Sequence, residues 1–223
     1  MTPPLTDALL VVAKQPAAGQ TKTRLTPPLS PDEAAALYEC FLRDTLDLIR
    51  RVPAVQPAIA YLPADATGYF TALAPDFELL PQHGPDLGAR LDHALTSYLH
   101  RGFAHVAIMN SDGPTLPVAY LTAAFDQLRD GADVVLGPAE DGGYYLIGLK
   151  RPAPRLLREV RMSTPTVLAD TLALAAEEEL KVALLPMWYD VDDVAALARL
   201  RVELAQAPAE IAPATRRFLL GEL

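Results

Sequence analysis

The segment from residue 8 to residue 49, ALLVVAKQPAAGQTKTRLTPPLSPDEAAALYECFLRDTLDLI, contains the pattern that decides the fold. It begins with a short apolar run, Ala8–Val12, of the kind that forms a strand buried on both faces of a parallel sheet. The letters SPDE at 30–33 then predict a helix start, because they combine a capping box with proline at the first helical position. Apolar residues recur at helical spacing from Ala34 to Ile49. The segment therefore reads as one strand, one loop and one helix.

The same alternation continues to the end of the chain. Further strands are expected at 58–62, 77–80, 105–110, 133–136, 144–149 and 182–185. Helices are expected at 68–73, 87–101, 118–130, 193–206 and 214–220, with two more helical stretches between 149 and 182. Strands and helices that alternate at this pace form βα units around a mostly parallel sheet. Because no repeat or low-complexity linker interrupts the pattern, we expect a single α/β domain over residues 1–223.

Composition limits the kinds of partner. The chain carries 28 acidic residues against 19 lysines and arginines, a net charge of −9, so nucleic acids and anionic lipid surfaces would be repelled. We therefore expect no nucleic-acid partner and no membrane association. The single cysteine, Cys40, excludes a disulfide within the chain and a cysteine-rich zinc site. Since the N-terminal region has no basic leader and only a short apolar run, we expect a cytoplasmic protein.

A local cluster of cations follows the first strand. Between residues 8 and 31 the chain carries Lys14, Lys22 and Arg24 and no acidic residue. A solvated basic loop would explain scattered cations, but three bases without an acid in so acidic a chain favour phosphate binding, with Gly19 permitting close backbone approach. A Walker-type P-loop is excluded, because it needs a glycine directly before the lysine and Thr21 stands there.

Carboxylates follow two other strands. Asp112 lies in NSDGPTLP after the strand at 105–110. It could be a functional carboxylate, or it could do no more than form an Asx-turn before the next helix. Asp190 and Asp192 are alternate residues of an extended stretch and can face the same side, whereas Asp193 is expected to cap the next helix. Close carboxylates repel by about 4 kcal/mol per pair at an effective dielectric near 20, and Mg²⁺ or Mn²⁺ would remove that cost. We expect these carboxylates to form a metal site on the sheet edge that the basic loop also reaches.

The segment GPAEDGGYYLIGL at 137–149 could line an acceptor pocket. Its Asp141-Gly142-Gly143 predicts a tight turn between two strands. Glu140 or Asp141 at the lip of this turn could act as general base or bind sugar hydroxyls.

The segment PQHGPDLGARLDHAL at 81–95 offers a place for a nucleotide base. Asp86 is a candidate helix cap. The residues around it that could admit a base and reach its phosphates are Gln82, Gly84, Gly88 and Arg90.

Taken in order, five segments carry a family resemblance: AKQPAAGQTKTRL, QHGPDLGARL, NSDGPTLP, LGPAEDGGYYLIGL and YDVDDVAAL. Together they resemble a bacterial glycosyltransferase family that is often labelled arsenosugar-biosynthesis glycosyltransferase and is related to the MobA-like nucleotidyltransferases. The resemblance extends from about Leu9 to Leu200. It implies the GT-A-type, Rossmann-like three-layer sandwich of the nucleotide-diphospho-sugar transferase superfamily.

The resemblance also implies roles for particular residues. Asp112 stands where the superfamily places its main metal-binding aspartate, and Asp192 matches the second position, with Asp190 beside it. The loop after the first strand resembles a variant of the phosphate-gripping loop of sugar-phosphate nucleotidyltransferases. It contains Lys14, Lys22, Thr23 and Arg24. Those enzymes carry paired glycines in Gly-x-Gly-Thr-Arg, whereas this loop has one glycine, which favours glycosyl transfer over nucleotidyl transfer.

The resulting hypothesis is a glycosyltransferase that depends on Mg²⁺ or Mn²⁺ and passes a sugar from a nucleotide-diphosphate sugar to a small-molecule acceptor. Asp112 would bind the metal at the diphosphate, and Glu140 or Asp141 would act on the acceptor. Two alternatives stay open: a nucleotidyltransferase that releases pyrophosphate, and a non-catalytic nucleotide-binding protein. The oligomeric state is also open, a homodimer being one option.

Overall fold

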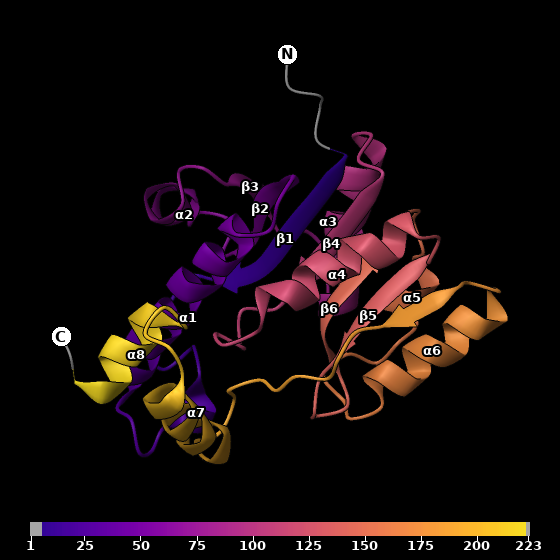
Figure 1. The fold of residues 1–223 in the computed structure, drawn as a ribbon. Helices are drawn as coiled ribbons and strands as arrows, with labels where there is room; N and C mark the ends of the chain where they lie inside the picture. The colour runs from indigo at the N-terminus through magenta and orange to yellow at the C-terminus, as the bar shows by residue number, and fades with distance from the viewer. Residues whose placement is uncertain (1–5, 222–223) are drawn as a thin grey trace.

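The computed structural model describes residues 6–221, which form a seven-stranded sheet in the order β3-β2-β1-β4-β6-β5-β7 (Figure 1). The strands are β1 (Asp7–Lys14), β2 (Val55–Leu62), β3 (Glu78–Pro81), β4 (His105–Met109), β5 (Val134–Pro138), β6 (Tyr144–Leu149) and β7 (Val182–Leu184). All run parallel except β6, which pairs antiparallel with β4 and with β5. The expected mostly parallel sheet is confirmed, and the reversal of β6 follows from the tight turn that joins it to β5.

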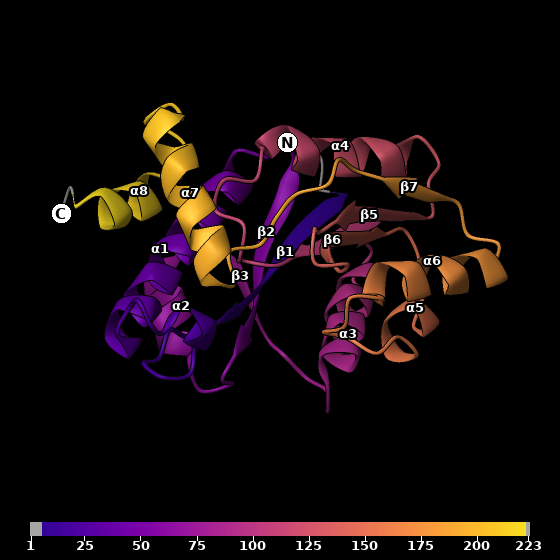
Figure 2. The same ribbon diagram turned by 90° about the horizontal axis from the view of Figure 1, so that it is seen from below.

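Helices cover both faces of this sheet (Figure 2). One layer contains α1 (Pro31–Arg50), α2 (Thr67–Leu73), α4 (Val118–Arg129), α7 (Val194–Gln206) and α8 (Pro213–Leu220). The other contains α3 (Leu87–His100), α5 (Arg155–Arg158) and α6 (Val167–Glu177). Within residues 6–221 no helix is long and apolar enough to cross a membrane.

Strand β1 shows how the sequence produces three layers. Leu9 and Val11 pack into the core under α1 and α4, whereas Ala8 and Leu10 pack into the core under α3 and α5. Successive side chains of a strand point to opposite faces, so a continuous apolar run must be covered on both sides. The three-layer α/β sandwich is therefore confirmed.

The start of α1 is fixed by its expected cap. The Ser30 hydroxyl accepts a hydrogen bond from the Glu33 N–H at 3.2 Å, and the Glu33 carboxylate accepts one from the Ser30 N–H at 2.7 Å. Both contacts satisfy backbone donors that a helix start leaves without an intrahelical partner.

The strand order reverses between β1 and β4. From β1 the chain moves outward to β2 and β3, and then returns to place β4 on the other side of β1. Loops that leave the carboxyl ends of two such strands diverge and leave a crevice, which is where open α/β sheets bind ligands. Lys14 ends β1 and Asn110 follows β4, so the crevice lies between the basic loop and the segment that carries Asp112.

The C-terminal helices return to the first half of the chain and pack beside α1 (Figure 1). Asp44 of α1, which is 4% exposed, accepts hydrogen bonds from the backbone N–H groups of Ala214 and Thr215 at 2.9 and 2.8 Å. Asp44 thus caps the first turn of α8 from a different helix.

We expect Asp44→Ala to lower the free energy of unfolding by about 1–2 kcal/mol, because it leaves two buried donors of α8 without an acceptor. Urea unfolding followed by circular dichroism measures this change. The control is Asp47→Ala, which removes a carboxylate one turn further along α1 whose side chain is 59% exposed. Equal effects of the two substitutions would contradict the capping role.

Candidate active site

A pocket of about 430 Å³ opens at the reversal point of the sheet. It is bounded by the ends of β1 and β4, the loop that contains η1 (Thr23–Leu25), the turn between β5 and β6, and the segment after β7. One wall is polar and includes Lys14, Gln20, Lys22, Arg24, Asp112, Asp141, Asp190 and Asp192. The rest of the lining is largely apolar and includes Leu87, Leu91, Ile108, Tyr144, Ile147 and Met162. The pocket therefore offers both charged and apolar side chains to one ligand.

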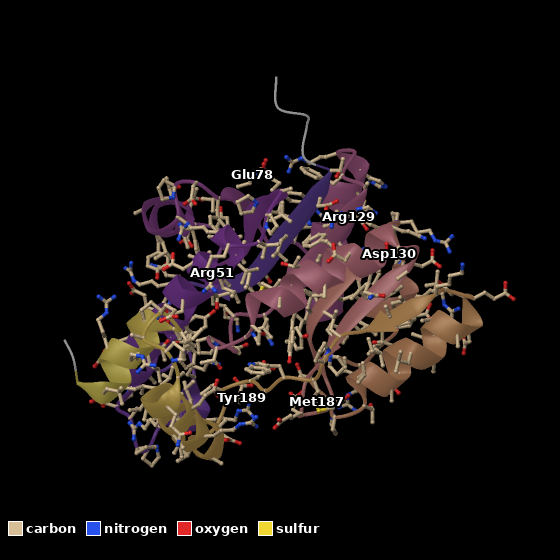
Figure 3. The ribbon with its side chains drawn as sticks, in the orientation of Figure 1. Arg51, Glu78, Arg129, Asp130, Met187 and Tyr189 are labelled. Carbon is tan, nitrogen blue, oxygen red and sulfur yellow. The ribbon has the colours of Figure 1, made fainter. Side chains whose placement is uncertain are left out.

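The segment after β7 delivers two of the carboxylates to this pocket. It crosses the edge of the sheet at which β5 and β4 end, and Tyr189 and Met187 mark its course in Figure 3. The Trp188 N–H donates to the Pro138 carbonyl at 3.0 Å, and the Val191 N–H donates to the Asp112 carbonyl at 2.8 Å. These two backbone hydrogen bonds bring the residues on either side of Val191 next to Asp112, although β7 itself lies at the edge of the sheet.

The Lys22 ammonium lies between the carboxylates. Its Nζ donates to Asp112 Oδ1 at 2.5 Å, to Asp192 Oδ1 at 2.8 Å and to the Val191 carbonyl at 2.9 Å. The Lys22 side chain is only 5% exposed. Arg24 donates to the other oxygen of Asp192 at 2.7 Å, but its side chain is 67% exposed.

These ion pairs keep the cluster charged. Burial alone would lower the pKa of Lys22, but the charges of Asp112 and Asp192 outweigh it, so the pKa lies above its ordinary value. Burial would likewise raise the pKa of Asp192, whereas Lys22 and Arg24 together hold it below its ordinary value. Lys22 is therefore an ammonium and Asp192 a carboxylate at neutral pH.

The turn after β4 frees Asp112 to make these contacts. The Asn110 side-chain oxygen accepts from the Asp112 N–H at 3.3 Å, so the Asx-turn is formed by Asn110. The next residue, Ser111, is buried and donates to the Val12 carbonyl at 3.1 Å while its hydroxyl lies 3.0 Å from that of Tyr38. These bonds tie the end of β4 to β1 and to α1 beneath the carboxylates.

Asp190 occupies a different environment from Asp192. Both of its oxygens accept from the Asn110 amide at 3.0 Å. Burial, and after it the negative charge of Asp112, raises the pKa of Asp190 to about 7, although the hydrogen bond from Asn110 opposes the shift. Asp190 thus sits beside the Lys22 cluster without an ion pair to it.

Asp141 reaches the pocket from the turn between β5 and β6. One of its oxygens accepts from the Gly143 N–H at 2.9 Å, which orients the carboxylate. Gly142 has φ of +89°, and a Cβ there would lie 2.0 Å from the Pro165 carbonyl oxygen, so the turn packs closely on the loop before α6. The expected tight turn between two strands is confirmed.

Several residues predicted for the site lie outside the pocket lining: Gly19, Gln82, Gly84, Gly88, Arg90 and Glu140. The Glu140 carboxylate is paired with the Arg199 guanidinium at 2.8 Å on the surface. The Gln82 amide donates to a carbonyl at the end of β2 at 2.9 Å. A Cβ on Gly88 would lie 2.0 Å from the Leu157 carbonyl oxygen, so this glycine permits α3 to approach α5. Glu140, Gln82 and Gly88 thus make contacts within the protein, and contact of any of the six residues with a ligand stays a prediction.

Other lining residues were missed by sequence reasoning. The loop before α6 contributes Met162, Ser163 and Thr164, and α3 contributes Leu87 and Leu91. The α3 leucines read as ordinary core positions of a helix. The loop carries no motif, and its one unusual feature, a φ of +62° at Ser163, is visible only in the structure.

The oxygen atoms around the Lys22 ammonium are of the type that binds a divalent cation. Two carboxylates and one carbonyl converge on a single point, and hard cations such as Mg²⁺ and Mn²⁺ prefer such oxygen ligands. The Lys22 ammonium holds that point, and within residues 6–221 no group of three or more acidic, histidine or cysteine side chains surrounds a common centre. The residues therefore suit a metal only when Lys22 withdraws.

Solved structures place the fold among nucleotide-using transferases. A structure described as a "putative nucleotide-diphospho-sugar transferase" from Desulfovibrio desulfuricans G20 is 33% identical, covers 97% of this chain and 94% of its own, and superposes with a TM-score of 0.89. CMP:2-keto-3-deoxy-manno-octonic acid synthetase with CTP shares the fold at 12% identity, TM-score 0.58, with 90% of this chain and 98% of its own covered. Rv0371c of Mycobacterium tuberculosis H37Rv in complex with manganese also shares the fold. It is 17% identical, superposes with a TM-score of 0.53, and the match covers 87% of this chain and 97% of its own.

The chain belongs to the family described as "Uncharacterized protein conserved in bacteria (DUF2064)", whose model matches residues 45–164. No curated protein matches the chain significantly by sequence. The class of protein is thus the nucleotide-diphospho-sugar transferase-like fold, as the sequence resemblance implied, and DUF2064 is the particular family.

The raised pKa of Asp190 predicts a pH-dependent stability. Between about pH 4, where an unfolded aspartate titrates, and pH 7, the folded protein binds more protons at Asp190 than the unfolded chain does, so stability falls as the pH rises. An asparagine side chain at this position cannot ionise and avoids this loss. We therefore compare the melting temperatures of Asp190→Asn and wild type, both in EDTA. We expect the variant's melting temperature minus that of wild type to be larger at pH 8 than at pH 5.

Thermal unfolding at the two pH values checks this expectation. Asp126→Asn, which alters a side chain that is 57% exposed, is the control and should give the same difference at both. A difference for Asp190→Asn that does not change with pH would contradict the assignment.

Proposed function

We propose that the protein is a transferase that binds a nucleotide-diphosphate sugar and passes the glycosyl group to a small-molecule acceptor. The observation that carries the proposal is the meeting of Asp112, Asp192, Lys22 and Arg24 at the reversal point of the sheet, in the lining of the pocket. The 33% identity to a structure described as a "putative nucleotide-diphospho-sugar transferase" supports it.

The residues of the polar wall would act on the diphosphate. Lys22 and Arg24 would offset the charge that develops on the leaving nucleoside diphosphate, with Lys14 and Thr23 nearby in the same wall. Asp112 and Asp192, with Asp190 beside them, would hold Mg²⁺ or Mn²⁺. When bound, such an ion neutralises phosphate charge and acts as a Lewis acid.

Other residues of the lining would receive the acceptor and the apolar part of the donor. Asp141, on the polar wall at the turn between β5 and β6, has its carboxylate oriented by the Gly143 N–H and would hydrogen-bond or deprotonate an acceptor hydroxyl. Glu140 is less suited to this role, because it is paired with Arg199 outside the pocket. The apolar part of the lining, which includes Leu87 and Ile147, would pack against a ring.

A nucleotidyltransferase is the second candidate. Its support is that the same cations and carboxylates would serve an α-phosphate equally well, and that the fold is shared with CMP:2-keto-3-deoxy-manno-octonic acid synthetase, which was solved with CTP. The single glycine of the loop before η1 favours the glycosyltransferase.

Product analysis separates the two candidates. A panel of nucleotide sugars and nucleoside triphosphates is first screened with Mn²⁺ by thermal shift, where ligand at about 100 times its Kd stabilises by about 2.7 kcal/mol. Ligands that bind are then tested for turnover by ³¹P NMR. We expect a nucleoside diphosphate from a nucleotide sugar; pyrophosphate from a triphosphate would favour the second candidate, and nucleotide binding without any turnover would favour a non-catalytic protein.

We expect Asp112→Asn to reduce kcat by about 10²–10³, because it would weaken the hold on the ion that neutralises phosphate charge, and the loss of one electrostatic stabiliser at a reacting centre costs about this much. The matched control is Asp193→Asn. Asp193 adjoins Asp192 but caps α7 through the Ala196 N–H at 2.9 Å, and asparagine caps equally well. Turnover that survives in Asp112→Asn would count against the proposed site.

A further inference from the structure

The Lys22 ammonium lies between the two aspartates that are proposed to hold a divalent cation. Its three oxygen partners lie at 2.5, 2.8 and 2.9 Å, and the side chain is 5% exposed. The Nζ also lies 5.4 Å from the centre of the Phe41 ring and 5.9 Å from that of Tyr38. The ammonium thus contacts both carboxylates and lies near two aromatic rings.

A metal and Lys22 would compete for the same oxygens. A divalent ion held by Asp112 Oδ1 and Asp192 Oδ1 would lie within a few ångströms of the ammonium, and like charges at such a distance in a buried site repel strongly. Arg24 does not compete in this way, because it contacts the outer oxygen of Asp192 from an exposed position.

The backbone at Lys22 is suited to a change of position. Lys22 has φ of 50° and ψ of 39°, the left-handed region that a residue with a Cβ adopts at a cost in free energy. The loop is anchored on either side of it, since the Thr21 hydroxyl donates to the Ala17 carbonyl at 3.0 Å and Leu25 is fully buried. The contacts of the ammonium offset this strain, so removal of its oxygen partners favours another conformation of Lys22 while the loop keeps its place.

We propose that Lys22 is an internal cation that a divalent metal must displace from Asp112 and Asp192, and that the displaced ammonium then serves the phosphates of the nucleotide. The inference rests on the proposed function, because it assigns the metal and the diphosphate to this site. It follows that the metal and the nucleotide enter together, since the pocket that receives the phosphates is also lined by Lys22. Metal alone must compete with an ammonium that is already in place.

The test measures Mn²⁺ affinity without nucleotide, by the loss of the free-ion EPR signal, for wild type and Lys22→Met. We expect Lys22→Met to bind Mn²⁺ at least tenfold more tightly. Arg24→Met controls for the loss of a nearby positive charge and should change the affinity by less than threefold. Lys150→Met, which removes a lysine paired with Asp133 at 3.0 Å, controls for net charge and should leave the affinity unchanged. Equal Mn²⁺ affinities of wild type and Lys22→Met would overturn the proposal that the metal displaces Lys22. Equal gains in Mn²⁺ affinity for Lys22→Met and Arg24→Met would also overturn it.

A second measurement uses the wild-type protein and does not depend on the folding of a variant. Reductive methylation of the lysine amines is followed by mass spectrometry with and without saturating Mn²⁺. We expect Lys22 to be protected without metal and to react several-fold faster with it, whereas Lys150 and Lys181 react at constant rates. Protection of Lys22 that persists at saturating Mn²⁺ would overturn the proposal.

The two proposals can fail separately. Wild-type protein that binds a nucleotide sugar together with Mn²⁺, but shows no gain in Lys22→Met, refutes the exchange and leaves the proposed function intact. Protein that binds neither Mn²⁺ nor any nucleotide, in wild type and in Lys22→Met, refutes both.

Discussion

The ion pairs between Lys22, Asp112 and Asp192 join three segments that are far apart in the sequence. Lys22 belongs to the loop after β1, Asp112 to the turn after β4, and Asp192 to the segment after β7. Two carboxylates near one point need a counter-charge, and here the protein supplies it from its own chain. The cluster therefore ties the loop after β1 to the turn after β4 and to the segment that leads into α7.

The sheet provides the frame in which these segments can meet. Parallel strands end at one edge, and the reversal between β1 and β4 opens a crevice there. β7 lies at the far edge of the sheet, yet Asp190 and Asp192 reach the crevice because the following segment is hydrogen-bonded across the ends of the intervening strands, at Pro138 and at Asp112. The charged groups therefore gather at a place where the fold leaves room for a ligand.

Much of this arrangement could be predicted from local patterns. Apolar runs of four to six residues with helical segments between them are strong signals, and the caps at Ser30, Asp86 and Asp193 are all made as expected. Glycines were less informative. Gly88 was predicted to contact a ligand, and the structure shows that it also permits α3 to approach the Leu157 carbonyl. Close packing of two helices and close approach to a ligand make the same demand on a residue without a side chain, so the sequence cannot separate them.

The sequence by itself determined the layers of the fold, the direction of most strands and the set of charged residues at the strand ends, because burial periodicity and helix caps are local properties. Only the tertiary structure decided how those charges are paired. It placed Lys22 between Asp112 and Asp192, turned Glu140 outward to Arg199, and buried Asp190 against Asn110. The physical reason is that an ion pair is set by distances of a few ångströms between segments up to 170 residues apart, and no local pattern encodes such a distance.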